Sequence, residues 1–192
     1  MSEALKNRKT VWKTFWLWQY EEEEAWLNQM AAEGWVLEEV HFFRYGFTRC
    51  QPGEYILRLE MMNGSPAMDE NQEYIWFVRG TGAEYVGKLK NWVYFRKKAA
   101  EGPFELFSDL DSRLAHVERV LCLAAVLFGA MALNFLLYLN SVFIGRGSLE
   151  ELTFEALPLL ALSAAMLFWI GRGCRKLWTL RKKLKEERRL RE

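Results

Sequence analysis

The sequence has few of the residues on which catalytic and metal sites are usually built. It contains only two histidines, His41 and His116, and three cysteines that lie far apart, Cys50, Cys122 and Cys174. No CxxC pair and no Cys/His spacing typical of zinc sites is present. The scattered cysteines fit a reducing compartment better than a disulfide framework.

Motifs of phosphate-binding and nucleophilic enzymes are also missing. Gly80-Thr81-Gly82 lacks the downstream Lys-Ser/Thr of a phosphate-binding loop, and no serine stands in a nucleophile-elbow pattern. We therefore predict no catalytic residue, no metal site and no cofactor. The N-terminus lacks the apolar segment of a signal peptide, so we expect that the first domain is not exported by a cleaved signal.

Charge is divided unevenly along the chain. The residues before Val120 include 15 Lys/Arg and 19 Asp/Glu, whereas the segment from Gly171 onward includes 10 Lys/Arg and 3 Asp/Glu. Because the first part is mildly acidic and has no basic footprint, we expect no nucleic-acid partner.

Two uncharged runs separate these regions. Val120–Gly145 is longer than the roughly 20 residues that a helix needs to cross a bilayer core. The second run, Ala156–Gly171, is just short of that length, and a re-entrant segment is its alternative. We predict transmembrane helices at 120–144 and 153–171, joined by a short external loop at 145–152.

The flanks of the runs predict a topology. The positive-inside rule places the basic tail, 172–192, in the cytoplasm, so both termini would be cytoplasmic at the inner (plasma) membrane. Residues 108–119 form either a helix that continues into the membrane or an amphipathic linker on its surface. Asn134 in the first run can favour helix–helix contact, within the hairpin or in a homo-oligomer.

The tail also suggests a lipid contact. Basic side chains next to a span attract anionic lipid, although the interpretation that we favour is a topology signal alone. The residues expected to face membrane lipid are Arg172, Arg175, Lys176, Arg181, Lys182 and Lys183.

Residues 11–107, after an N-terminal extension at 1–10, alternate between strand and helix patterns. We expect helices after Tyr20 and over Asp69–Arg79. We expect strands over Val11–Trp18, Trp35–Phe43, Tyr45–Cys50 with a turn at Arg44–Gly46, Tyr55–Met62, Glu84–Lys88 and Trp92–Lys97.

A shift of 48 residues superimposes the two halves of this region. It lays Leu27 on Ile75, Met30 on Val78, and Gly34 on Gly82. We interpret the halves, about 11–50 and 54–98, as two strand–helix–strand–strand units. The predicted fold class is α+β, an antiparallel sheet with two helices on one face, followed by a two-helix transmembrane hairpin.

Aromatic residues are abundant in this domain. They could line an apolar pocket or contact a partner, or they could simply form the core of a small domain. In the predicted first strand, alternation would place Trp12, Trp16 and Trp18 on one face. The candidate ligand or partner surface is Trp12, Trp16, Trp18, Trp35, Tyr45, Tyr55 and Tyr94.

Several short motifs together resemble a known family. They are Trp26-Leu27-Asn28, Gly34-Trp35, Tyr45-Gly46-Phe47, Tyr55 through Arg58, Tyr94-Phe95-Arg96, and Phe107-Ser108-Asp109 before Ser112. Over roughly residues 12–120 the chain resembles the domain-of-unknown-function 2812 family, bacterial proteins that often carry C-terminal membrane helices. Ala83 departs from the second Gly-Trp expected there. The resemblance implies that the gene lies beside genes of PadR-type transcriptional regulators. The doubled unit is also similar in fold to the small-molecule-binding domain of GyrI-type proteins.

These observations favour a membrane-tethered cytoplasmic sensing or interaction module. It would act by binding a small apolar ligand or a protein partner, with a PadR-type regulator as one possible target. The alternative is a structural or accessory subunit of a membrane complex, in which the transmembrane hairpin is the functional part.

Overall fold

The computed structural model describes residues 7–107, 110–144 and 157–191. The chain divides into two compact units, Met1–His116 and Val117–Glu192. The first unit contains β1 (Arg8–Trp12), η1 (Leu17–Gln19), α2 (Tyr20–Ala32), β2 (Trp35–His41), β3 (Arg44–Arg49), β4 (Tyr55–Met61), α3 (Asp69–Gly80), β5 (Glu84–Leu89), β6 (Trp92–Lys98) and η2 (Ala99–Glu101).

The described strands form two antiparallel three-stranded sheets, in the orders β1-β3-β2 and β4-β6-β5. Each sheet comes from one strand–helix–strand–strand unit, so the predicted α+β class and the duplication are confirmed. The repeat extends to an irregularity in the ladder: the register slips between Leu37 and Glu39 and again, 48 residues later, between Tyr85 and Gly87.

The structure differs from the predicted arrangement of the helices. Val93 and Phe95 of β6 pack in one cluster with α3, whereas Tyr94 packs in the other cluster with α2. Because successive side chains of a strand point to opposite faces, α2 and α3 cover opposite faces of the second sheet. The strands therefore do not form one sheet with both helices on one face.

The predicted first strand is wrong after Trp12. β1 pairs with β3 from Arg8↔Thr48 to Trp12↔Arg44, and β3 begins at Arg44. Past that point the chain turns: the Gln19 N–H donates to the Trp16 carbonyl at 2.7 Å, and the Trp16 N–H donates to the Gln19 side chain at 3.0 Å. Trp12, Trp16 and Trp18 therefore do not share a strand face.

The turn between β2 and β3 also lies earlier than predicted. His41 pairs with Arg44, so Phe42 and Phe43 form a two-residue turn in place of Arg44–Gly46. Phe43 has φ of +63°, a left-handed conformation that bulky side chains seldom adopt.

Side chains of α2 form hydrogen bonds with backbone groups on the outer edge of β4. The Asn28 amide donates to the Leu57 carbonyl at 2.9 Å and its oxygen accepts from the Leu57 N–H at 2.9 Å. The Leu59 N–H donates to Glu24 at 3.2 Å. An edge strand with open N–H groups invites pairing with another chain, and these bonds remove that opportunity.

We predict that Asn28→Ala lowers the free energy of unfolding by about 2 kcal/mol, because it leaves two backbone groups of Leu57 without their partners. Denaturation of the full-length protein in detergent, followed by tryptophan fluorescence, measures the change. Gln29→Ala, at an exposed neighbouring position, is the control and should leave stability nearly unchanged. Equal stability of the Asn28 variant and the wild type would contradict this role.

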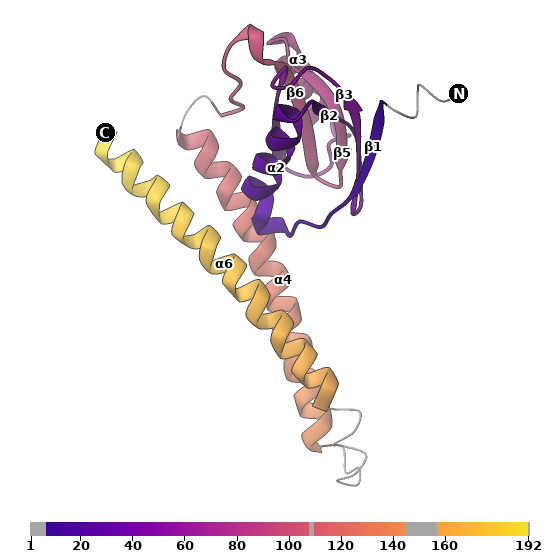
Figure 1. The fold of residues 1–192 in the computed structure, drawn as a ribbon. Helices are drawn as coiled ribbons and strands as arrows, with labels where there is room; N and C mark the ends of the chain where they lie inside the picture. Colours follow the sequence, from indigo (N-terminus) through magenta and orange to yellow (C-terminus); the bar gives the residue numbers. More distant parts are fainter. Residues whose placement is uncertain (1–6, 108–109, 145–156, 192) are drawn as a thin grey trace. The chain divides into compact units, whose positions relative to one another are not determined.

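The second unit contains two long helices that run side by side (Figure 1). α4 (Leu110–Ile144) begins in the first unit, and α6 (Leu157–Arg191) includes both the second uncharged run and the basic tail. Both helices are long and apolar enough to cross a membrane, and few residues of their apolar windows are buried. Of the two alternatives for residues 108–119, the structure has the helix: residues 110–119 are continuous with the first uncharged run in α4. The predicted loop at 145–152 lies outside the described residues.

The first turns of α4 belong to the first unit. His116 is almost fully buried among the rings of Tyr20, Trp92 and Phe107, with centroids 5.0–5.7 Å from its own. The Met61 N–H donates to its Nδ1 at 3.4 Å. His116 therefore anchors the first turns of α4 in the α+β unit.

Candidate functional site

The seven aromatic candidates have different surroundings in the first unit. Trp16 stacks on buried Trp18 with centroids 5.5 Å apart, and Trp12 is exposed. Trp35 and Tyr55 are half-buried, and the guanidinium groups of Arg49 and Arg96 lie 4.5 and 5.2 Å from their ring centroids. Tyr45 and Tyr94 belong to the core.

Tyr45 and Tyr94 meet on one buried carboxylate. Their hydroxyls donate to the same oxygen, Oε1 of Glu23, at 2.8 and 2.7 Å. Burial raises the pKa of Glu23, and the two hydrogen bonds oppose that shift. Since the tyrosines come from β3 and β6 and Glu23 from α2, this cluster joins the two repeats.

The exposed side of α3 carries two aromatic side chains that are not among the seven candidates. Trp76 is 66 % exposed and Phe77 is 71 % exposed, whereas Ile75 and Val78 face the core. The signal was present in the sequence, because residues 76 and 77 fall outside the apolar stripe of the predicted helix. At the equivalent positions of α2, 48 residues earlier, stand the polar Asn28 and Gln29.

A hollow of about 740 Å³ adjoins Trp76. The Arg79 guanidinium lies over the Trp76 ring, 4.9 Å from its centroid, and has no acidic partner within the described segments. Glu84, in contrast, is paired with Arg96 at 2.7 Å. The hollow is lined by Trp76, Arg79, Gly80, Gly82, Ala83, Glu84 and Tyr85. Together with Phe77 these residues form what we call the α3 surface.

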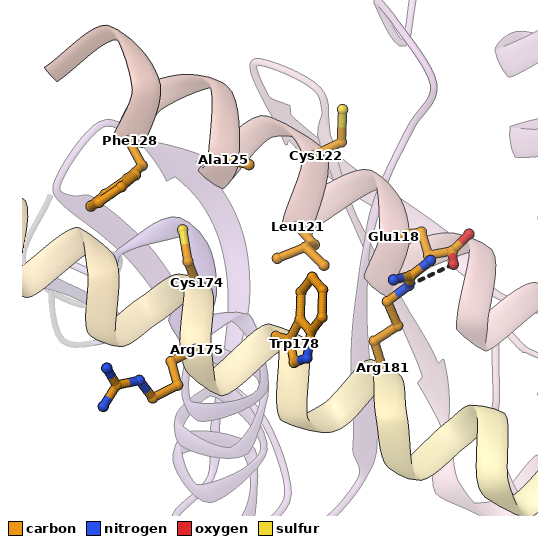
Figure 2. A pocket seen from close by; sticks show the side chains of 9 residues that line it. All are labelled: Glu118, Leu121, Cys122, Ala125, Phe128, Cys174, Arg175, Trp178 and Arg181. Atoms are coloured by element: carbon orange, nitrogen blue, oxygen red, sulfur yellow. Dashed lines mark hydrogen bonds and ion pairs between the residues drawn. The ribbon is translucent and has the colours of Figure 1, made fainter. Parts of the chain in front are cut away.

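The second unit has a groove of about 600 Å³ between α4 and α6 (Figure 2). Leu121 and Trp178 face each other across it, and Glu118 accepts a hydrogen bond from Arg181 at 2.7 Å at one end. The groove is lined by Glu118, Leu121, Cys122, Ala125, Phe128, Cys174, Arg175, Trp178 and Arg181. It is mostly apolar, with a charged end.

The basic residues of the tail lie on α6. Arg181 is half-buried and pairs with Glu118, and its guanidinium and the Lys182 ammonium lie 5.9 Å from the Trp178 ring centroid. Arg172 lies 6.0 Å from the Phe168 ring. Lys176, Lys183 and the rim residue Arg175 are exposed.

Over residues 7–107, 110–144 and 157–191, no group of three His, Cys, Asp or Glu side chains lies close enough to hold a metal ion. The features that stand out are instead two surfaces: the aromatic α3 surface and the apolar faces of α4 and α6. Exposed apolar surfaces of this kind are typical of sites where proteins or membranes bind.

Comparison with protein families gives a match. The model of a family described as protein of unknown function (DUF2812) matches residues 19–129, more than half of the chain. The chain belongs to this family. The match includes the α+β unit from Gln19 onward, just before α2, and the first part of α4, so the DUF2812 region includes the anchor at His116. No curated protein and no solved structure matches the chain.

Proposed function

We propose that this DUF2812 protein is a membrane-tethered interaction module that binds a protein partner through the α3 surface. The observation that carries the proposal is the exposure of Trp76 and Phe77 on a helix whose core face is already complete. Large aromatic side chains next to an arginine are the usual anchors of protein interfaces.

The internal repeat supports a binding role for these aromatics. α2 holds the same place in the first repeat as α3 in the second, and it carries Asn28 and Gln29 where α3 carries Trp76 and Phe77. Gln29 is exposed like its counterpart Phe77, so the fold does not need an aromatic side chain at this position. The chemistry of the α3 surface fits a partner that presents an apolar side chain for the hollow and a carboxylate for Arg79.

The tether consists of α4 and α6, which we place across the plasma membrane as a hairpin. Their exposed apolar side chains need a non-aqueous surrounding, and the basic residues after Gly171 favour the cytoplasmic side. Both termini and the α+β unit are then cytoplasmic.

Cysteine labelling in intact cells tests this topology. A cysteine introduced at Ser148 should react with a membrane-impermeant maleimide added from outside, and a cysteine introduced at Lys183 should react only after the cells are opened. The parent chain carries Cys50→Ser, Cys122→Ser and Cys174→Ser. Labelling of position 183 but not 148 in intact cells would reverse the proposed orientation.

The competing function, a structural or accessory subunit, assigns the activity to the hairpin. The groove between α4 and α6 supports this competing function, because it offers an apolar surface to another membrane helix. Replacing the hairpin with an unrelated two-span anchor separates the two functions. Our proposal expects partner capture to survive the exchange, and loss of capture with the α+β unit still folded would favour the accessory subunit.

The nature of the partner is a separate question. A PadR-type regulator follows from the family resemblance alone, and purified regulator is one arm of the binding test. The other arm of the test adds a small apolar ligand to the full-length protein. Quenching of tryptophan emission by the ligand, to the same extent in the wild type and in Trp76→Ala, would favour a ligand-binding function away from the α3 surface.

A further inference from the structure

One end of the α+β unit carries exposed aromatic side chains among basic ones. Trp12 is 73 % exposed, Phe42 54 % and Phe43 48 %. Arg44 and Lys90 stand beside them and are also exposed. We call these five residues the aromatic end.

Hydrogen bonds and ring contacts bring the five residues to one place. Trp12 is paired with Arg44 in the ladder of β1 and β3, and the Lys13 N–H donates to the Phe43 carbonyl at 3.0 Å. The Phe42 and Phe43 rings are in contact with centroids 4.6 Å apart, and the Lys90 ammonium lies 5.3 Å from the Phe42 centroid. The turns at 42–43 and 90–91 and the end of β1 thus form one surface.

The fold does not use these aromatics for its core. Val11 packs against the core, so alternation places the neighbouring Trp12 on the outer face of the sheet. Phe43 holds a left-handed φ of +63°, where glycine or asparagine would be less strained. A bulky, exposed residue in a strained turn is a candidate for function.

The basic residues of the aromatic end are available for an external anion. Arg44 and Lys90 form no ion pair within the described residues, in contrast to Arg96 with Glu84 and Arg58 with Glu24. Aromatic rings mixed with unpaired cations are typical of segments that lie in the headgroup region of a membrane with anionic lipid.

We infer that the aromatic end inserts into the headgroup layer of the membrane and binds anionic phospholipid there. The inference rests on the proposed tether, which keeps the α+β unit close to the bilayer. It adds a second, reversible contact, with Trp12, Phe42 and Phe43 in the interface and Arg44 and Lys90 on lipid phosphates. The domain is then held in one orientation at the membrane surface.

Quenching by brominated lipid tests the inference in the full-length protein. The protein is reconstituted into vesicles of phosphatidylglycerol and phosphatidylcholine, with or without bromine on the acyl chains. Subtracting the emission of Trp12→Phe from that of the wild type isolates Trp12. Trp76→Phe is the matched control, because Trp76 is similarly exposed but lies on α3, away from the aromatic end.

We expect brominated lipid to quench most of the Trp12 emission and to leave the Trp76 emission unchanged. Arg44→Gln and Lys90→Gln should each lower the ratio of membrane-bound to unbound α+β units by about fivefold. One basic residue near an anionic surface strengthens binding by about that factor. Trp12 emission that is unquenched, or quenched no more than that of Trp76, would overturn the inference. Failure of the chain to float with the vesicles after alkaline extraction would instead overturn the tether.

Discussion

Removing both hydroxyls from the Glu23 cluster, with Tyr45→Phe and Tyr94→Phe together, is expected to destabilise the protein by about 3 kcal/mol at neutral pH. The double variant leaves a buried carboxylate without its two hydrogen-bond donors, and an uncompensated buried charge costs about 3–5 kcal/mol. Denaturation of the full-length protein in detergent measures the loss. A change in the free energy of unfolding below about 0.5 kcal/mol would show that the cluster does not stabilise the contact between the two repeats.

The pH dependence of this loss has a definite sign. Burial raises the pKa of Glu23 above its ordinary value of 4.5, so between these two values the folded state binds more protons than the unfolded state. Stability therefore falls as pH rises through that window and is highest on its acid side. The double variant lacks the hydrogen bonds that oppose the shift, so its deficit should widen toward neutral pH and narrow as the pH falls.

Glu23→Gln provides the control for this effect. The amide oxygen of glutamine can still accept from both tyrosines, and it does not titrate. In that background, removal of the two hydroxyls should cost the same free energy at every pH. Glu24, whose pKa is also raised by burial, is present in all variants and cancels in the difference.

The second large effect concerns binding. Trp76→Ala and Phe77→Ala should each weaken the complex with the partner by at least about 2 kcal/mol, or roughly 30-fold in Kd, as is usual for central aromatic anchors. Arg79→Glu should weaken it too, by repelling the carboxylate expected on the partner. Titration of the captured partner against the full-length protein in lipid nanodiscs measures these affinities.

Two controls separate binding from folding. Gln29→Ala changes the equivalent exposed position of the first repeat and should leave the affinity unchanged. The unfolding free energies of Trp76→Ala and Phe77→Ala should stay within about 0.5 kcal/mol of the wild type, because both side chains are largely exposed. Wild-type affinity in both α3 variants would exclude the α3 surface as the binding site.

Strongly periodic parts of the chain were predictable from sequence. The helix over Asp69–Gly80 repeats its apolar residues at helical spacing, and the two long apolar helices follow from the length of their uncharged runs. The 48-residue shift matches the strand pairs that the structure contains. The failure at Val11–Trp18 has a local cause. Composition indicates strand throughout, whereas the bonds between Trp16 and Gln19 and the limited length of β3 end the strand at Trp12.

The placement of the helices on opposite faces also has a sequence correlate. Trp92 through Phe95 is continuously apolar, which is typical of a strand that is covered on both sides. The candidate surface was harder to predict. Tyr45 and Tyr94 were selected for their aromatic character, yet sequence does not reveal that Glu23 lies between them. Trp76 and Phe77 fall outside the core stripe of the predicted helix, and that position is what exposes them.

Photo-crosslinking in living cells tests the central claim most directly. A benzoylphenylalanine is placed at Phe77 of the full-length chain, or at Gln29 as the matched position of the first repeat. We predict one discrete protein adduct from position 77 in the membrane fraction, absent from position 29 and lost when Arg79→Glu is added. No adduct from position 77, or the same adducts from both positions, would contradict a membrane-tethered module that binds its partner through the α3 surface.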